Sequence, residues 1–114
     1  MKAHPFPPTY RVVKGRDFAR LKAQGAVFRT KKLIFNYAPA EVSRVGIIVT
    51  KKVGNAVFRN RVKRWVRESY RLTRPVIRQS VDIVIIPRTS RLSFDAISQD
   101  LSFFIGWLDE KTTR

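Results

Sequence analysis

Cationic side chains crowd into the stretch KKVGNAVFRNRVKRWVRESYR, residues 51–71, and binding phosphate is the chemistry that such side chains do best. The stretch carries eight Lys or Arg against a single acid, Glu68. An ordinary solvated helix face mixes the two signs so that residues four apart can pair. Here Arg67 has like charges four residues away on both sides, at Lys63 and Arg71, which is unfavourable unless an anion lies over them. The stretch therefore predicts a surface that binds a polyanion.

The choice of arginine narrows the kind of polyanion. Five of the seven charged residues between positions 59 and 71 are Arg. Arginine forms two parallel hydrogen bonds to phosphate and stacks on bases, so this composition favours a structured nucleic acid over a lipid surface. The whole chain has 24 Lys and Arg against 8 acids, a formal charge of +16, and such a charge opposes compaction unless an anionic partner offsets it.

Residues for catalysis or metal binding are scarce. The chain has no cysteine, and its one histidine, His4, lies in a proline-rich lead-in that offers no rigid support for a general base. The eight acids form no pair with the spacing of a Mg²⁺ site, and transition-metal ligands are missing. The sequence thus predicts a binding protein with no catalytic side chain and no metal site of its own. Lack of cysteine fits a cytoplasmic protein, and no apolar run reaches the roughly 18 residues of a membrane span.

The elements that must position the cations can be read from periodicity. Asn55 is a good helix N-cap, and residues 56–73 place Phe58, Val62, Trp65, Val66 and Ser69 within one arc, with the cations opposite. Around this helix we expect a short helix in GRDFARLKAQ, one bent strand or two short strands over 26–38, strands at 44–50 and 81–87, and a final helix from about 92 to 111. One domain over residues 1–114, with an extended lead-in at 1–13, follows from the length. The order predicts an α+β, two-layer sandwich.

A weaker signal lies in the first half of the chain. Four aromatic residues are interleaved there with five cations, and aromatics beside cations on an open sheet can stack single-stranded bases. The aromatics are Phe18, Phe28, Phe35 and Tyr37, and the cations are Arg20, Lys22, Arg29, Lys31 and Lys32. An ordinary sheet core explains any one of these aromatics equally well, because strand alternation puts Leu33, Phe35 and Tyr37 on one face.

The segment KKVGNAVFRNRVKRWVRES strongly resembles the signature of the bacterial ribonuclease P protein subunit. A basic pair, a Gly-Asn-Ala-Val loop, Arg-Asn-Arg and then Lys-Arg follow one another as in that family. Looser likenesses are Asp17-Phe18, the Arg-Val-Gly-Ile strand at 44–47 and the Asp-Ile-Val-Ile-Ile-Pro-Arg strand at 82–88. The resemblance implies three helices on a four-stranded sheet in the order α-β-β-β-α-β-α. It also implies a left-handed βαβ crossover, as in the ribosomal protein S5 domain 2-like fold.

The same resemblance implies a function. Members assist a catalytic RNA that removes the 5′ leader from precursor tRNA; the RNA and its Mg²⁺ perform the hydrolysis, and no protein oligomer is required. Residues matching the family's contacts to the catalytic RNA are Lys51, Lys52, Asn55, Arg59, Asn60, Arg61, Lys63, Arg64 and Arg67, with Arg71 added from the same face. Residues expected at the leader-binding cleft are Phe18, Lys22, Phe35 and Tyr37. Lys22 replaces a second family aromatic, and the family's strand tyrosine aligns with either Asn36 or Tyr37.

Two other functions fit the charge pattern. A structural RNA binder of the ribosomal kind would use the same basic helix without taking part in hydrolysis. A protein of the membrane surface would expose Trp65 and Phe58 beside the cations.

Overall fold

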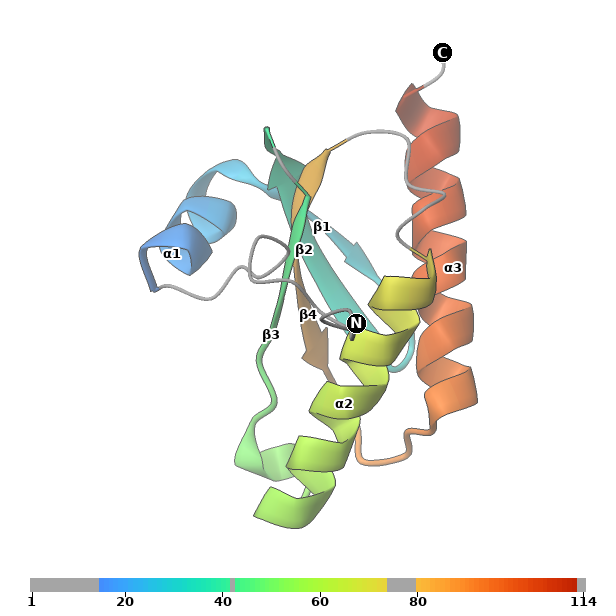
Figure 1. The fold of residues 1–114 in the computed structure, drawn as a ribbon. Helices are drawn as coiled ribbons and strands as arrows, with labels where there is room; N and C mark the ends of the chain where they lie inside the picture. Colours follow the sequence, from blue (N-terminus) through green and yellow to red (C-terminus); the bar gives the residue numbers. More distant parts are fainter. Residues whose placement is uncertain (1–14, 42, 74–79, 113–114) are drawn as a thin grey trace, which may run out of the picture.

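The computed structural model describes residues 15–41, 43–73 and 80–112, and it contains three α-helices, one 3₁₀ turn and four strands there (Figure 1). The elements are α1 (Gly15–Gln24), β1 (Ala26–Arg29), β2 (Leu33–Pro39), β3 (Arg44–Ile47), η2 (Lys51–Val53), α2 (Ala56–Thr73), β4 (Val81–Pro87) and α3 (Phe94–Thr112). The predicted bounds of α2 and β4 are confirmed, and the segment 26–38 forms two strands. The lead-in at 1–13 lies outside the described residues.

Strand β3 is shorter than the sequence predicts. It ends at Ile47 instead of residue 50, and among the described strands it pairs with β4 alone. The last bond of the pair runs from the Ile48 amide to the Ile85 carbonyl at 3.1 Å. Beyond it the chain leaves the sheet toward η2, although Val49 still packs on the core. The apolar run at 44–50 therefore combines a strand with a connection whose apolar residues, Ile48 and Val49, are half-buried.

The four strands form one mixed sheet in the order β1-β2-β4-β3. Antiparallel pairs join β1 to β2 and β2 to β4, whereas β3 and β4 are parallel, with Val45 opposite Ile83. In Figure 1 the edge strand β3 is nearest the viewer and runs downward, α2 returns upward on the right, and β4 runs downward behind β3. This path turns counter-clockwise as it recedes, so the crossover is left-handed, an exception to the strong right-handed rule.

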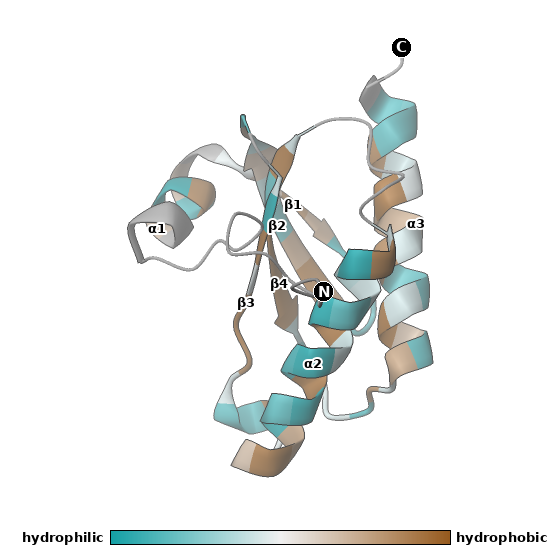
Figure 2. Cartoon of the chain, viewed as in Figure 1, coloured by the Kyte–Doolittle hydropathy of each residue, from teal (hydrophilic) through white to brown (hydrophobic). Residues whose placement is uncertain are grey.

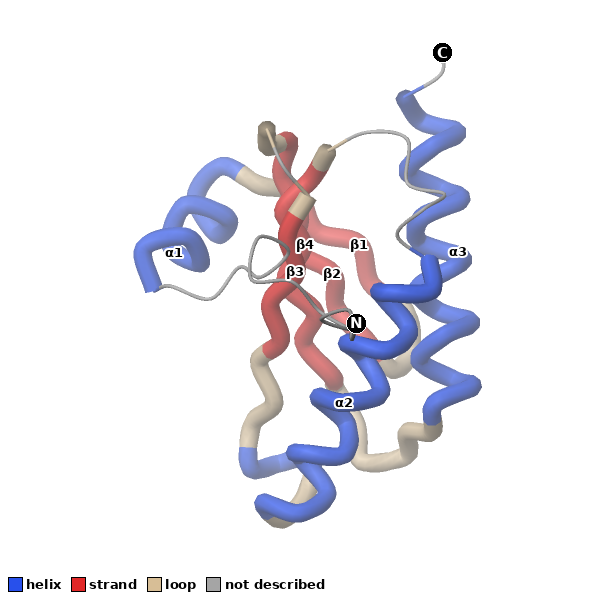
Figure 3. Tube along the Cα trace, viewed as in Figure 1, coloured by secondary structure: helices blue, strands red, loops and turns tan. Residues whose placement is uncertain are grey.

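The helices lie on both faces of the sheet (Figure 3). Helices α2 and α3 pack together on one face, and α1 covers part of the other. The main core lies between the sheet and the α2–α3 pair, where the ring of Phe35 stacks on that of Phe104 at 4.5 Å. Every residue of β4 except Ile86 is buried, so this strand is covered on both faces, as its nearly continuous apolar sequence requires. The fold is thus α+β, with α1 adding a partial third layer to the predicted two.

The face of the sheet that carries α1, here called the α1-side face, has a much smaller core. Leu21 of α1 packs on Ala38 and Val84, and Ile48 and Ile86 lie half-buried beside them. At the end of α1 the Gly25 amide donates to the Leu21 carbonyl at 2.8 Å. A β-carbon at Gly25 would lie 2.6 Å from the Tyr37 carbonyl oxygen, so only glycine lets the helix turn this closely into the sheet.

Candidate nucleic-acid interface

The turn before α2 is held by its own hydrogen bonds. The Asn55 side-chain oxygen accepts from the Phe58 amide at 2.9 Å, which is the predicted N-cap. Arg59 donates from Nη1 to the Gly54 carbonyl at 2.8 Å and so ties the first turn of α2 to the loop. Gly54 has φ +157°, and a β-carbon there would lie 2.9 Å from the Phe58 ring. Asn55 and Arg59, predicted to contact RNA, therefore also shape the backbone that presents the other cations.

Helix α2 separates its core and solvent faces as predicted. Its buried residues are Val62, Val66, Ser69, Tyr70 and Thr73. The predicted RNA-contacting residues that are exposed are Lys51, Lys52, Asn55, Asn60, Arg61, Arg64, Arg67 and Arg71, whereas Arg59 and Lys63 are half-buried. Figure 2 shows the hydrophilic side of α2 turned away from the sheet. The helix thus presents a row of cations, called here the α2 cationic face, at the surface.

The apolar residues Phe58 and Trp65 anchor this helix. Their rings pack edge to face with centroids 6.1 Å apart, and both side chains are half-buried against the main core. The arrangement agrees with their predicted role as anchors. It disfavours a membrane-surface protein, which would leave both side chains exposed beside the cations.

Arg71 of the α2 cationic face pairs with an acid of the same helix. The Arg71 guanidinium binds the Glu68 carboxylate, with Nε 3.3 Å from Oε1 and a second, shorter contact from Nη2 to Oε2. This hydrogen bond lowers the pKa of Glu68 below its usual range and raises the pKa of Arg71. Both side chains are exposed, so the pair is weak and open to competition from a phosphate.

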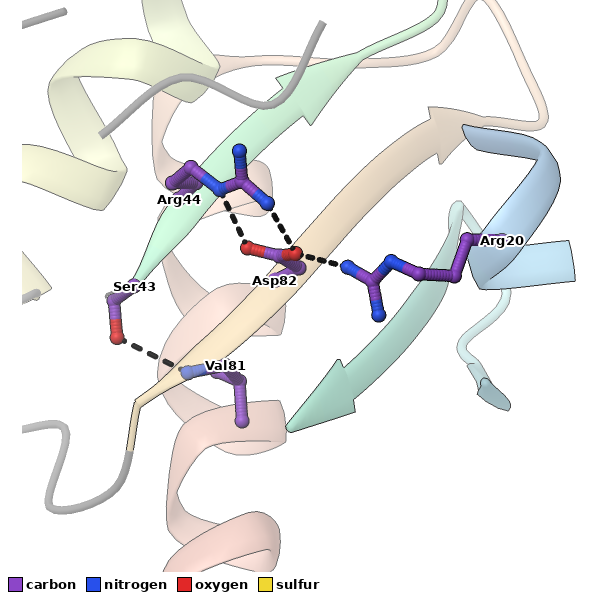
Figure 4. A network of polar contacts seen from close by, with 5 residues as sticks. All are labelled: Arg20, Ser43, Arg44, Val81 and Asp82. Carbon is purple, nitrogen blue, oxygen red and sulfur yellow. Dashed lines mark hydrogen bonds and ion pairs between the residues drawn. The ribbon is translucent and has the colours of Figure 1, made fainter. Parts of the chain in front are cut away.

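A second cationic site joins α1 to the sheet (Figure 4). The Asp82 carboxylate on β4 is fully buried and accepts from Arg44 Nε at 2.9 Å, from Arg44 Nη2 at 2.8 Å and from Arg20 on α1. About a third of each arginine side chain is exposed, 34% for Arg20 and 32% for Arg44. Beside them the Val81 amide donates to the Ser43 hydroxyl at 3.1 Å. Two cations around one acid leave this end of α1 with net positive charge.

This network was not predicted from the sequence, although the sequence contains a signal for it. Asp82 is the one charged residue in the apolar run VDIVIIP. A carboxylate in a strand that is buried on both faces needs a cationic partner. The partners could not be chosen without coordinates, because Arg20 lies 62 residues away in the chain and Arg44 lies 38 away.

The prediction that Phe35 and Tyr37 line an open cleft is wrong. Both side chains are buried on the sheet face that packs against α3, where each ring contacts Phe104. A ring covered by a helix has no face on which a base can stack. Asn36, the other residue considered for the strand position, lies on the α1-side face and is also buried. Its Oδ1 atom has no hydrogen-bond partner among the described residues.

The remaining cleft predictions concern α1. Lys22 is exposed on α1, as a contact to a leader requires. Phe18 belongs to the same helix, but its side chain lies outside the described residues. On the sheet, the α1-side face offers half-buried Ile34, Ile48 and Ile86, and exposed residues Val27 and Arg29 on β1. This face therefore combines apolar surface with cations at its margins.

The described part of the chain contains neither a cluster of metal ligands nor a membrane-spanning helix. Within residues 15–41, 43–73 and 80–112, no three His, Cys, Asp or Glu gather closely enough to hold a metal ion. Across those residues, no helix is both long and apolar enough to cross a membrane.

A sandwich fold with a cationic helix on one side and a partly open sheet face on the other defines a nucleic-acid-binding protein. The family model named Ribonuclease P matches residues 6–108. The ribonuclease P protein component of Desulforapulum autotrophicum is 44% identical over 100% of this chain and 97% of its own length. The chain belongs to the ribonuclease P protein family.

Solved structures agree with this membership. The RNase P protein of Thermotoga maritima superimposes with a TM-score of 0.75 and 32% identity, covering 83% of this chain and 94% of that one. For the RNase P protein of Staphylococcus aureus the TM-score is 0.74 and the identity 29%, with coverage of 82% and 90%. Members are protein components of an endoribonuclease of tRNA processing, so membership implies a partner RNA subunit.

Proposed function

We propose that this chain assists a catalytic RNA in removing the 5′ leader from precursor tRNA, binding the RNA subunit through the α2 cationic face and the single-stranded leader on the α1-side face. The observation that carries the proposal is the α2 cationic face itself. Its exposed cations stand on a helix whose first turn is fixed by Asn55 and Arg59, and such a preorganised row suits a phosphate backbone.

The hydrolysis is assigned to the RNA subunit and its Mg²⁺. The protein contributes positive charge at a place where two RNAs meet, and that charge reduces the number of divalent ions needed to hold the phosphates together. We therefore expect the chain to lower the Mg²⁺ concentration that cleavage requires. The chain is proposed to act in the cytoplasm, where precursor tRNA is made.

The leader is assigned to the α1-side face for two reasons. Lys22 on α1 and Arg29 on β1 are exposed, one on the helix that borders the face and one on its edge strand, where they can meet phosphates. On the same face the half-buried isoleucines Ile34, Ile48 and Ile86 provide apolar surface for bases without hydrogen-bond readout, which suits a leader of variable sequence.

The test is cleavage of a leader-bearing precursor tRNA by a bacterial ribonuclease P RNA at low Mg²⁺, with and without the chain. Stimulation by the chain, and tighter binding of the precursor than of mature tRNA by the complex, are expected. Arg64→Gln should weaken assembly with the RNA, whereas Gln99→Glu, which makes the same change in net charge on α3, should not. Absence of stimulation by the folded wild-type chain would overturn the proposal. Stimulation without a preference for the precursor would overturn the leader site alone.

A further inference from the structure

We propose that the edge of the molecule formed by β1 and α3 is an additional contact for RNA, which stacks unpaired bases on Phe103. This β1–α3 edge consists of the aromatic residues Phe28, Phe103 and Trp107 and the cations Lys31, Lys32, Arg88 and Arg91. It is separate from both surfaces assigned above. Strand β1 is the sheet edge opposite β3, and Phe28 faces α3 rather than α1.

Exposure of Phe103 is the first observation. Its side chain is 65% exposed, and it is the one aromatic among the large apolar side chains exposed in the described part of the chain. It does not stand alone: the ring of Phe28 lies 5.9 Å away, and that ring lies 4.6 Å from Trp107. Phe28 and Trp107 are only partly buried. The three rings thus make a continuous aromatic surface with a rigid base in the core.

Positive charge beside these rings is the second observation. Asp100, one helical turn before Phe103, accepts from the Thr30 hydroxyl at 2.7 Å and so fixes the turn between β1 and β2 against α3. Arg88 locks the same turn, with its amide 2.8 Å from the Lys32 carbonyl oxygen and its Nη1 2.8 Å from the Thr30 carbonyl oxygen. Lys31, Lys32 and Arg88 therefore belong to this turn, and Arg91 lies three residues before α3 in the chain. The acids at this end of α3 are Asp95 in its first turn and Asp100.

The other end of the edge is less cationic. Lys111 lies over the Trp107 ring at 5.0 Å, next to the acids Asp109 and Glu110. A phosphate backbone is therefore expected to approach from the β1–β2 turn and leave its bases on Phe103. An aromatic platform flanked by cations is the usual construction of sites for single-stranded nucleic acid.

Other occupants fit less well. A second copy of the chain would bring two molecules of formal charge +16 together. A basic peptide would be repelled by the four cations of the turn. An anionic lipid surface matches the local chemistry, but the chain belongs to a family that already works on RNA. RNA with unpaired bases is therefore the occupant that the charge and the family favour.

The experiment reads the edge directly through Trp107. Trp65→Phe leaves Trp107 as the one tryptophan, since the chain has two. A short unstructured oligoribonucleotide and an abasic oligonucleotide of equal length are titrated into this variant and into its Phe103→Ala, Phe103→Leu and Phe103→Tyr derivatives. The normal oligonucleotide should change the Trp107 fluorescence. Phe103→Ala and Phe103→Leu should weaken that response roughly 5- to 100-fold, and Phe103→Tyr should preserve it.

The abasic probe should bind all four proteins alike. Lys31→Gln should lower the salt dependence of the Trp107 response by about one counterion. An oligonucleotide response that Phe103→Ala leaves unchanged would overturn the proposal. A response that Phe103→Leu preserves would overturn stacking. Two further results would also overturn it: a Phe103-dependent dimer in equilibrium sedimentation, or Phe103-dependent binding to anionic vesicles without an effect on the oligonucleotide.

Discussion

Arg44 holds the buried carboxylate of Asp82 with two hydrogen bonds, from Nε to Oδ1 at 2.9 Å and from Nη2 to Oδ2 at 2.8 Å. Arg20 of α1 binds the same carboxylate, so a single acid of β4 joins α1 to the central part of the sheet (Figure 4). The apolar contact between α1 and the sheet is small, with Leu21 as its one fully buried α1 residue among those described. Asp82 is therefore a major determinant of where α1 lies.

Asp82→Asn should loosen α1. We expect the free energy of unfolding to fall by about 1–3 kcal/mol, because bonds to a charged acceptor become bonds to a neutral one. Since both arginines are partly solvated, a value near the lower end is expected. Urea unfolding measures the loss, and limited trypsin digestion should show faster cleavage after Arg20 and Lys22.

Asp100→Asn is the matched control for this prediction. Asp100 accepts from Thr30 at the β1–α3 edge, so its loss should also destabilise the fold but leave the tryptic sites of α1 protected. Equal acceleration of cleavage in both variants would mean that Asp82 does not hold α1 specifically.

Gly54→Ala should damage the turn before α2. The residue has φ +157°, and an added β-carbon would meet the Phe58 ring at 2.9 Å. We expect a loss of more than about 1 kcal/mol and weaker RNA binding, because the Gly54 carbonyl positions Arg59. Gly106→Ala on α3 meets nothing within 4 Å and should instead stabilise the fold by about 0.5–1 kcal/mol. Urea unfolding should show a lower free energy of unfolding for Gly54→Ala and a higher one for Gly106→Ala. Equal changes in the two variants would contradict the prediction.

Two substitutions at Asn55 distinguish its role as a helix cap from a direct contact with RNA. Asn55→Ala removes the acceptor of the Phe58 amide and should cost about 1 kcal/mol. Asn55→Ser restores a capping oxygen and should preserve both the stability and the affinity for the ribonuclease P RNA. A stable Asn55→Ser variant with weakened RNA binding would show that the amide itself contacts the RNA.

We expect Glu68 to compete with RNA for Arg71, because the two side chains form an ion pair. Glu68→Gln frees Arg71, so we expect tighter RNA binding and a steeper dependence on salt, by up to about one counterion. Asp95→Asn makes the same charge change in the first turn of α3 and should have little effect on RNA binding. If the two variants bind the RNA alike, the pair does not regulate Arg71.

Acid titration provides a further readout on the same pair. The pKa of Glu68 is lowered in the folded chain, so the pair contributes stability above the pKa of the unfolded carboxyl. That contribution is lost as the pH falls through the lower, folded-state pKa. The stability difference between wild type and Glu68→Gln should therefore be small at neutral pH and disappear in acid. A difference that persists in acid would have another cause.

Phe35 and Lys22 test the revised leader site. Phe35 is fully buried, so Phe35→Leu should lower the free energy of unfolding by roughly 1–3 kcal/mol and leave the preference for leader-bearing tRNA unchanged. Lys22→Gln should leave the free energy of unfolding unchanged, since Lys22 is exposed on α1. It should instead lower the preference for leader-bearing tRNA. Competition between precursor and mature tRNA measures the preference. A selective loss with Phe35→Leu would return this residue to the leader site.

Local chemistry accounts for what could be predicted from the sequence. Helix α2 could be placed closely because its N-cap, Asn55, and its apolar period are both local features of the sequence. The α2 cationic face could be predicted from the same period, since residues at helical spacing lie on the same side of a helix wherever that helix packs. Strand β4 could be predicted equally well, because a strand buried on both faces has a nearly continuous apolar sequence.

Relations across the sheet depended on the tertiary structure. Strand alternation shows that Phe35 and Tyr37 share one face of the sheet, but it does not show which face α3 covers. Because α3 packs on the face that carries both residues, they belong to the core and not to the leader site. The partners of Asp82 and the cluster of Phe28 with Phe103 each join residues 38 or more positions apart. The sequence by itself thus determined which cations share the exposed side of α2. The packing of α1 and α3 decided which aromatics remain open to RNA, because exposure depends on what the rest of the chain lays over them.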